Sequence, residues 1–154
     1  MEERMKAPIL ALALFVGLLA APARADWSDE VRATYDLLAG AQNARDLKKV
    51  RELLLDAPHF LWVSDGMSVW GRDATLERMG AFQEAEIWRV EPDLGRAVPV
   101  RVSETTAFLH LPLTLVMRLA AFTGQAALSR KRLCVRAAEG WRIAALFTTA
   151  EKPG

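Results

Sequence analysis

The sequence predicts an α+β domain in which three N-terminal helices pack on a curved antiparallel β-sheet. Two observations carry this prediction. Apolar residues recur at helical spacing up to about residue 82, and from residue 87 onward they alternate with a period of two. Short turn-like segments separate the later strands, as in antiparallel neighbours, and helices followed by such strands pack on one face of the sheet.

The segment before the first helix has the layout of a secretory signal. An apolar run spans residues 7–21, and residues 23–25 form a small-x-small cleavage motif. We therefore expect cleavage between Ala25 and Asp26, a periplasmic or secreted protein, and no stable membrane span after cleavage. Translation from Met5 would give the signal a conventional basic start, and an uncleaved N-terminal anchor is the alternative.

Residues 26–154 have the size of a single domain with one core. Residues 1–25 carry three of the 20 basic and two of the 19 acidic side chains, so the remaining chain has no net charge. This neutrality argues against a nucleic-acid partner. Cys134 is the only cysteine, which excludes an internal disulfide, and its strand-like surroundings favour a packed thiol over a nucleophile.

Each predicted helix follows a residue that can cap it. Ser28 precedes the first helix and Asp46 the second, and a third helix is expected to start at Asp73. Pro58 is expected to stop the second helix. The apolar stripes contain Val31, Tyr35, Leu38 and Gln42 in the first helix, Leu47, Val50, Leu53 and Leu54 in the second, and Leu76, Met79 and Phe82 in the third.

The second half of the chain reads as a series of strands joined by turns. Asp65-Gly66 is predicted to be a tight turn, because Asp tolerates such turns and Gly supplies a positive φ. Pro99 indicates an edge strand or a bulge, and Pro112 is expected to interrupt the longest strand. The predicted strands after residue 86 span 87–95, 97–103, 105–122, 125–138 and 140–150.

The two faces of the longest strand differ sharply. Alternate residues from 107 to 117 are all apolar and should pack beneath the helices. The next strand carries several arginines on one side, and two interpretations stay open. They can lie on an outer face that meets water or a second copy of the chain, since strand charges usually face water. Alternatively, two of them can receive a ligand carboxylate. The arginines assigned to this outer face, and to a possible homodimer, are Arg118, Arg130, Arg132 and Arg136.

Three short motifs occur in order along the chain: Arg45-Asp46-Leu47, Gly71-Arg72-Asp73 and Gly140-Trp141-Arg142-Ile143. Together they resemble the nuclear transport factor 2-like superfamily, and within it the SnoaL-like and ketosteroid-isomerase-like branches. The resemblance covers essentially all of residues 26–154. It implies a cone-shaped α+β barrel with an apolar pocket, often paired through its sheet.

The resemblance does not extend to isomerase chemistry. That chemistry needs a carboxylate base in an apolar pocket and facing donors. The family's donor tyrosine would fall near Leu38, but Tyr35 lies about one turn earlier. The late-strand acid would fall near Arg132, which has the opposite charge. The base would fall near Val63, two residues before Asp65.

Asp65 is nevertheless the candidate general base, with His59 or Arg72 assisting, if the chain is an enzyme. The two histidines lie far apart in sequence and have no third ligand at metal-like spacing, so neither a metal nor another cofactor is expected.

Aromatic residues are abundant on the elements that enclose the pocket in this fold. Three hypotheses follow: an exported domain that binds a small apolar or amphipathic molecule, an isomerase- or cyclase-type enzyme, or a dimeric interaction module of the cell envelope. The predicted pocket residues are Tyr35, Trp62, Trp70, Arg72, Trp88 and Trp141.

Overall fold

The computed structural model describes residues 26–82, 84–119 and 122–151. The elements are α1 (Trp27–Asn43), α2 (Leu47–Leu53), β1 (Leu61–Ser64), β2 (Met67–Trp70), α3 (Arg72–Phe82), β3 (Ile87–Pro92), the 3-10 helix η1 (Leu94–Arg96), β4 (Val98–Arg101), β5 (Thr106–Leu119), β6 (Phe122–Ala137) and β7 (Gly140–Ala150). The expected signal segment and its cleavage site lie outside the described residues. No helix in the described ranges is long and apolar enough to cross a membrane.

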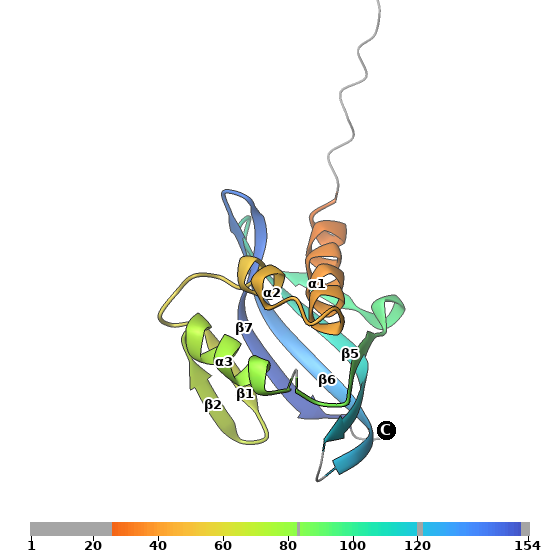
Figure 1. Cartoon of the computed structure of the whole chain (residues 1–154). Helices are drawn as coiled ribbons and strands as arrows, with labels where there is room; N and C mark the ends of the chain where they lie inside the picture. The colour runs from red at the N-terminus through yellow and green to blue at the C-terminus, as the bar shows by residue number, and fades with distance from the viewer. Residues whose placement is uncertain (1–25, 83, 120–121, 152–154) are drawn as a thin grey trace, which may run out of the picture.

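The strands form one curved sheet in the order β2-β1-β7-β6-β5-β3, and β4 also pairs with β5. The three helices lie on the same face of the long strands β5, β6 and β7 (Figure 1). The predicted α+β class, with helices packed on a curved sheet, is confirmed. The sheet stays open, with β2 and β3 at its two ends, so it does not close into a barrel.

The sheet is mixed, because β1 runs parallel to β7. The cause lies at the end of α2, which stops before the expected Pro58. Leu54 leaves the helix to form a parallel bridge with Ile143, and the N–H of Leu55 donates to the Ile143 carbonyl at 2.8 Å. The chain therefore enters the sheet alongside β7, and β1 continues in that direction.

The starts of the first two helices differ in how they are capped. The Asp46 carboxylate accepts a hydrogen bond from the Lys49 N–H at 2.9 Å and caps α2, as predicted. The N-cap of α1 is Asp26 rather than Ser28. Ser28 instead lies in the first turn of α1, and its hydroxyl donates to the Asp26 carboxylate at 2.8 Å.

The predicted turn at Asp65-Gly66 is confirmed and joins β1 to β2. Ser64 pairs with Met67, so the loop has two residues. Asp65 has φ 52° and Gly66 has φ 73°. Positive φ at both loop residues is the signature of a type I′ hairpin, whose twist suits the flanking strands.

The expected interruption of the longest strand at Pro112 is wrong, because β5 runs through it. Pro112 lies where the neighbouring strand changes: β4 pairs with residues 107–110 of β5, and β3 with residues 113–118. The missing N–H of proline therefore breaks no ladder hydrogen bond on that side. Its carbonyl accepts a hydrogen bond from the Asp93 N–H at 3.0 Å.

The prediction for the apolar face of β5 is confirmed, and the interpretation that placed Arg130 and Arg132 on the outer face is wrong. The alternate β5 residues from Ala107 to Leu115 are buried beneath the helices. Arg132 pairs with Leu109, and Arg130 with Leu111. Cross-strand partners point to the same side of a sheet, so both arginines face the core.

The other two arginines of the expected outer face each form an ion pair within the chain. Arg136 reaches α1 and forms an ion pair with Glu30. Arg118 is exposed and pairs with Glu86 at 2.9 Å beside β3. The four arginines therefore do not form a common surface.

Two glycine substitutions test the hairpin. Gly66→Ala is expected to lower the free energy of unfolding by about 1 kcal/mol, because alanine is strained at positive φ. The space around Gly66 is open, so the penalty comes from the backbone alone. Gly40→Ala, on the exposed side of α1, is the control and should raise stability by about 0.5–1 kcal/mol. Urea denaturation followed by circular dichroism measures both, and effects of the same sign would contradict the turn assignment.

Candidate functional site

A cavity of about 430 Å³ lies between the inner face of the sheet and the end of α3. Its size is within the range of small-molecule sites. Seven elements or turns contribute to it, so it depends on the whole fold. The lining residues are Trp62, Ser64, Asp65, Phe82, Trp88, Leu115, Met117, Ala126, Leu128, Arg130 and Thr148.

Three aromatic rings form one wall of the cavity. Phe82, at the end of α3, stacks on Trp88 of β3 with ring centroids 5.2 Å apart and an angle of 19° between the planes. Phe82 meets Trp62 of β1 edge to face at 6.3 Å. The Arg78 guanidinium lies over the Trp62 ring at 4.8 Å. The wall offers flat apolar surface to a ligand.

The polar groups of the cavity come from three adjacent strands. Ser64 of β1 pairs with Thr148 of β7, and Thr148 pairs with Arg130 of β6. Arg130 is only 6% exposed, although it lines the cavity. Its buried Nε and the buried Thr148 Oγ1 have no hydrogen-bond partner among the described residues. These unsatisfied polar atoms lie at a cavity that is otherwise mostly apolar.

Arg132 lies two residues further along the same face of β6 and is fully buried. Its guanidinium carbon is 3.5 Å from the centroid of the Tyr35 ring on α1. In the described part of the chain, the Arg132 guanidinium nitrogens and the Tyr35 hydroxyl lack hydrogen-bond partners. Burial lowers the pKa of Arg132 to about 10, so it stays charged at neutral pH.

Asp65 lies at the cavity, but the groups expected to assist it lie elsewhere. Its carboxylate accepts a hydrogen bond from the Ser64 hydroxyl at 3.1 Å. His59 is exposed before β1, and His110 points to the opposite face of β5 from the buried Leu109 and Leu111. Within the described ranges, His, Cys, Asp and Glu form no group of three that could hold a metal ion.

The other predicted pocket residues are divided among several places. Trp62 and Trp88 line the cavity, whereas Tyr35 lies beneath Arg132. Trp70 projects from β2 and is 59% exposed. Trp141 is buried at the other end of β7, where its indole N–H donates to Glu30 at 3.0 Å.

Arg72 also lies away from the aromatic cavity. It pairs with Asp56 at 2.8 Å and lines a separate groove of about 310 Å³. That groove is bordered by α2, the segment after it and the β6–β7 hairpin, with four charged neighbours of Arg72 in its lining. The ion pair gives Arg72 a structural role at the entry to α3.

Arg130 and Thr148 line the cavity but are not among the pocket residues predicted from the sequence. Arg130 could have been identified from its pairing with β5. The leucines of β5 face inward, and in this register the side chain of Arg130 must face inward as well. The interpretation in which two arginines bind a ligand carboxylate required them to face inward. The sequence alone does not give the register between β5 and β6, so it could not decide this.

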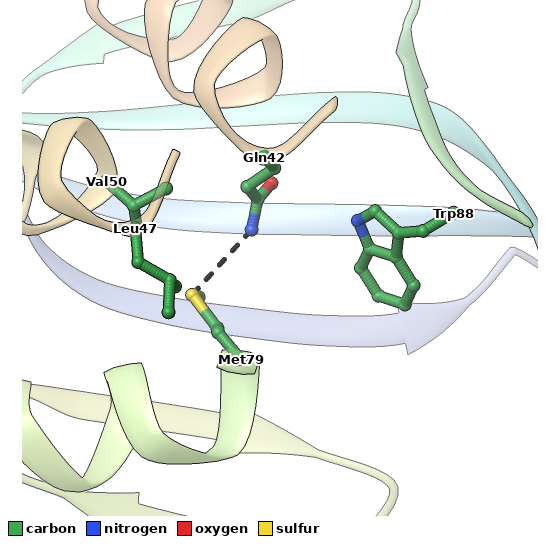
Figure 2. Close-up of a pocket in the computed structure, with 5 residues that line it drawn as sticks. All are labelled: Gln42, Leu47, Val50, Met79 and Trp88. Carbon is green, nitrogen blue, oxygen red and sulfur yellow. Dashed lines mark hydrogen bonds between the residues drawn. The ribbon is translucent and has the colours of Figure 1, made fainter. Parts of the chain in front are cut away.

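A second, much smaller cavity lies behind Trp88, between the three helices. Figure 2 shows the Gln42 amide reaching from α1 towards Met79 of α3, with Trp88 on one side and Leu47 and Val50 on the other. The amide donates to the Met79 sulfur at 3.8 Å. The cavity volume is about 10 Å³, which leaves room for at most one water molecule. It is a packing feature, too small for a ligand.

Cys134 is buried on the same face of β6 as the two arginines. Burial raises the pKa of its thiol to about 11, which keeps it protonated at neutral pH. The expectation of a packed thiol fits this environment.

Three helices on one face of a curved, open sheet (Figure 1) make the chain an α+β domain of the kind that the nuclear transport factor 2-like resemblance implied. A model of the SnoaL-like domain family matches residues 31–146. The chain belongs to this family, and the resemblance predicted from the three motifs is confirmed.

Solved structures share the fold at low sequence identity. A protein with a cystatin-like fold from Caulobacter vibrioides is 19% identical, with a TM-score of 0.71 over 82% of this chain and 90% of that chain. A nuclear transport factor 2-like protein of unknown function from Shewanella oneidensis is 15% identical, with a TM-score of 0.67 over 79% and 97%. A proposed dehydratase from Streptomyces avermitilis is 13% identical, with a TM-score of 0.70 over 82% and 97%. A comparison with curated proteins gives no match.

The buried charge of Arg132 leads to a stability prediction. Burial lowers the folded pKa of Arg132 to about 10, well below its ordinary value. The cost of burying the charge is therefore present in full at all pH values below about 10 and is relieved only as the pH rises above that value. We expect Arg132→Met to raise the free energy of unfolding at pH 7 by about 1–3 kcal/mol, since an apolar side chain of similar length removes that cost.

Arg136→Met provides the matched control on the same strand. Arg136 pairs with Glu30, so its loss should lower stability by about 1 kcal/mol or more. Urea denaturation at pH 7 measures both variants. A loss of stability in Arg132→Met would show that its contacts outweigh its desolvation.

Proposed function

We propose that this chain is an exported SnoaL-like domain that binds a small apolar or amphipathic molecule in the aromatic-walled cavity. The observation that carries the proposal is the cavity itself, about 430 Å³ and lined mainly by apolar side chains with a few polar groups. Binding sites for small molecules commonly have this composition. The signal-like pattern in residues 1–25 supports export.

Binding accounts for the cavity better than proton-transfer catalysis does. Asp65 is the one carboxylate lining the cavity among the described residues, and its hydrogen-bond partner is the Ser64 hydroxyl. A base of this kind works with positioned donors that stabilise the developing charge. Tyr35, the candidate donor, is buried against Arg132. Two structural neighbours carry dehydratase names, and those names describe the neighbours rather than this chain.

Substitutions at two adjacent residues of β6 test ligand binding. Ala126 lines the cavity, and the exposed Ala127 points to the opposite side of the strand. Ala126→Phe should fill part of the cavity and weaken binding of 2-naphthaleneethanol by about tenfold or more, because the volume available to the ligand shrinks. Ala127→Phe should leave the affinity unchanged.

Fluorescence titration of the purified protein measures both affinities. Equal binding by the Ala126→Phe variant and the unsubstituted protein would place the ligand elsewhere. Failure of the unsubstituted protein to bind naphthyl alcohols or naphthyl acids would overturn the proposal.

We also propose that two copies of the chain pair through the outer face of the sheet at β4 and β5. Val98, Val100 and Phe108 are exposed apolar residues in this region. Val100 pairs with Phe108, which pairs in turn with the half-buried Leu133 of β6. Neighbouring exposed apolar side chains are typical of interaction surfaces. This surface replaces the arginine face that the sequence suggested.

Phe108→Glu is expected to convert the pair into monomers, because it buries an unpaired charge in the interface. Sedimentation velocity measures the change, and Glu104→Gln, at an exposed position of the preceding loop, is the control. A monomeric unsubstituted protein would refute the pairing and leave the ligand proposal intact.

A further inference from the structure

We propose that the ligand carries a carboxylate head group and that Arg130 binds it at the polar side of the cavity, assisted by the Thr148 hydroxyl. This inference rests on the proposed ligand-binding function and specifies the class of ligand. The aromatic wall then holds the apolar body of the same molecule. The ligand is therefore an amphipathic carboxylic acid.

Arg130 differs from the arginines that stabilise the fold in having no carboxylate partner among the described residues. Arg72, Arg118 and Arg136 each pair with a carboxylate of this chain. Arg130 is more deeply buried than any of these and forms no ion pair with a described residue. A buried cation normally has an anionic partner, because desolvation is otherwise uncompensated. A ligand in the adjoining cavity can supply that partner.

Two buried polar atoms beside the cavity have unused hydrogen-bonding capacity. The Nε of Arg130 is a donor and the Oγ1 of Thr148 can donate its proton, and neither has a partner in the part of the chain that the structure describes. The two residues are direct cross-strand neighbours on the inner face. A planar carboxylate has two oxygens that can accept hydrogen bonds from a guanidinium and a hydroxyl together. The chemistry of both donors therefore matches one head group.

Arg132 adds a second positive charge behind this position. Arg132 packs against Tyr35 and does not line the cavity, so it makes no direct contact with a ligand there. Residues i and i+2 of a strand share a face and lie about 7 Å apart, and the interior screens charge weakly. Arg132 therefore favours an anion at Arg130 through its field.

Asp65 is the acidic residue in the cavity lining, and its negative charge opposes the positive charge of Arg130 and Arg132. It adjoins Ser64 on β1, and β7 lies between β1 and β6. Two strand spacings separate Ser64 from Arg130, roughly 10 Å. Asp65 also accepts a hydrogen bond from Ser64 and forms no ion pair with Arg130 in the described structure. Arg130 is therefore not neutralised by an ion pair with Asp65 and remains available to an anionic ligand.

Three probes with one apolar body separate the head-group preference from cavity binding: 2-naphthaleneacetate, 2-naphthaleneethanol and 2-naphthaleneethylamine. Titrations at pH 7 with the purified chain should show the acetate binding about tenfold or more tightly than the alcohol. The amine should bind most weakly. Equal affinities for acetate and alcohol would overturn the carboxylate assignment while ligand binding stands. A preference for the amine would assign recognition to Asp65 and also overturn it. Absence of binding by all three would overturn both proposals.

Substitution of Arg130 tests which residue is responsible. Arg130→Gln should reduce the affinity for the acetate to about that for the alcohol and leave the alcohol affinity within about twofold. Lys131→Gln is the control: it removes the same charge from the adjacent, exposed position on the other side of β6. Arg130→Lys keeps the charge but loses the planar fork, and should bind the acetate with intermediate affinity. A carboxylate preference that persists in folded Arg130→Gln, or that Lys131→Gln removes, would refute the role of Arg130.

Discussion

The register between β5 and β6 determines the chemistry of the inner face. The ladder runs without a break from Thr106, opposite Val135, to Leu119, opposite Phe122. The alternate leucines of β5 must face the helices, and a slip of one residue would turn all side chains of β6 to the other side. Burying the apolar face of β5 therefore also brings Arg130 into the core. The helices and the cavity lie on this same inner face of the sheet (Figure 1).

This register has an energetic cost at Arg132, and it places Arg130 where we propose that a carboxylate binds. A fully buried guanidinium with a single aromatic contact is less favourable than an apolar side chain in the same place. Natural proteins depart from optimal packing mainly at sites that bind or react. The contact with Tyr35 offsets part of the cost, since an aromatic face attracts a cation. The remaining cost is consistent with a site that is completed by an anion from outside the chain.

Local features of the fold could be predicted from the sequence, but the composition of the cavity could not. The Asp65-Gly66 turn and the Asp46 cap depend on neighbouring residues, so short-range rules suffice. The inward side of β6 depends on pairing with β5 and β7. Both sides of β6 look acceptable in sequence, because arginines alternate with apolar and basic residues. Pro112 was misjudged for the same reason: its effect depends on which strand lies beside it.

The position of Arg132 supports the proposal of ligand binding over isomerase chemistry. The resemblance implied a late-strand acid near this position and a donor tyrosine on the first helix. In this chain a cation occupies the strand position, and Tyr35 lies against it as a ring rather than as a hydrogen-bond donor. An acid buried there would stay neutral and could only donate a hydrogen bond, whereas a guanidinium also attracts a carboxylate by its charge. A cation at this one inward-facing residue, within an unchanged fold, would therefore change which molecules the proposed site favours.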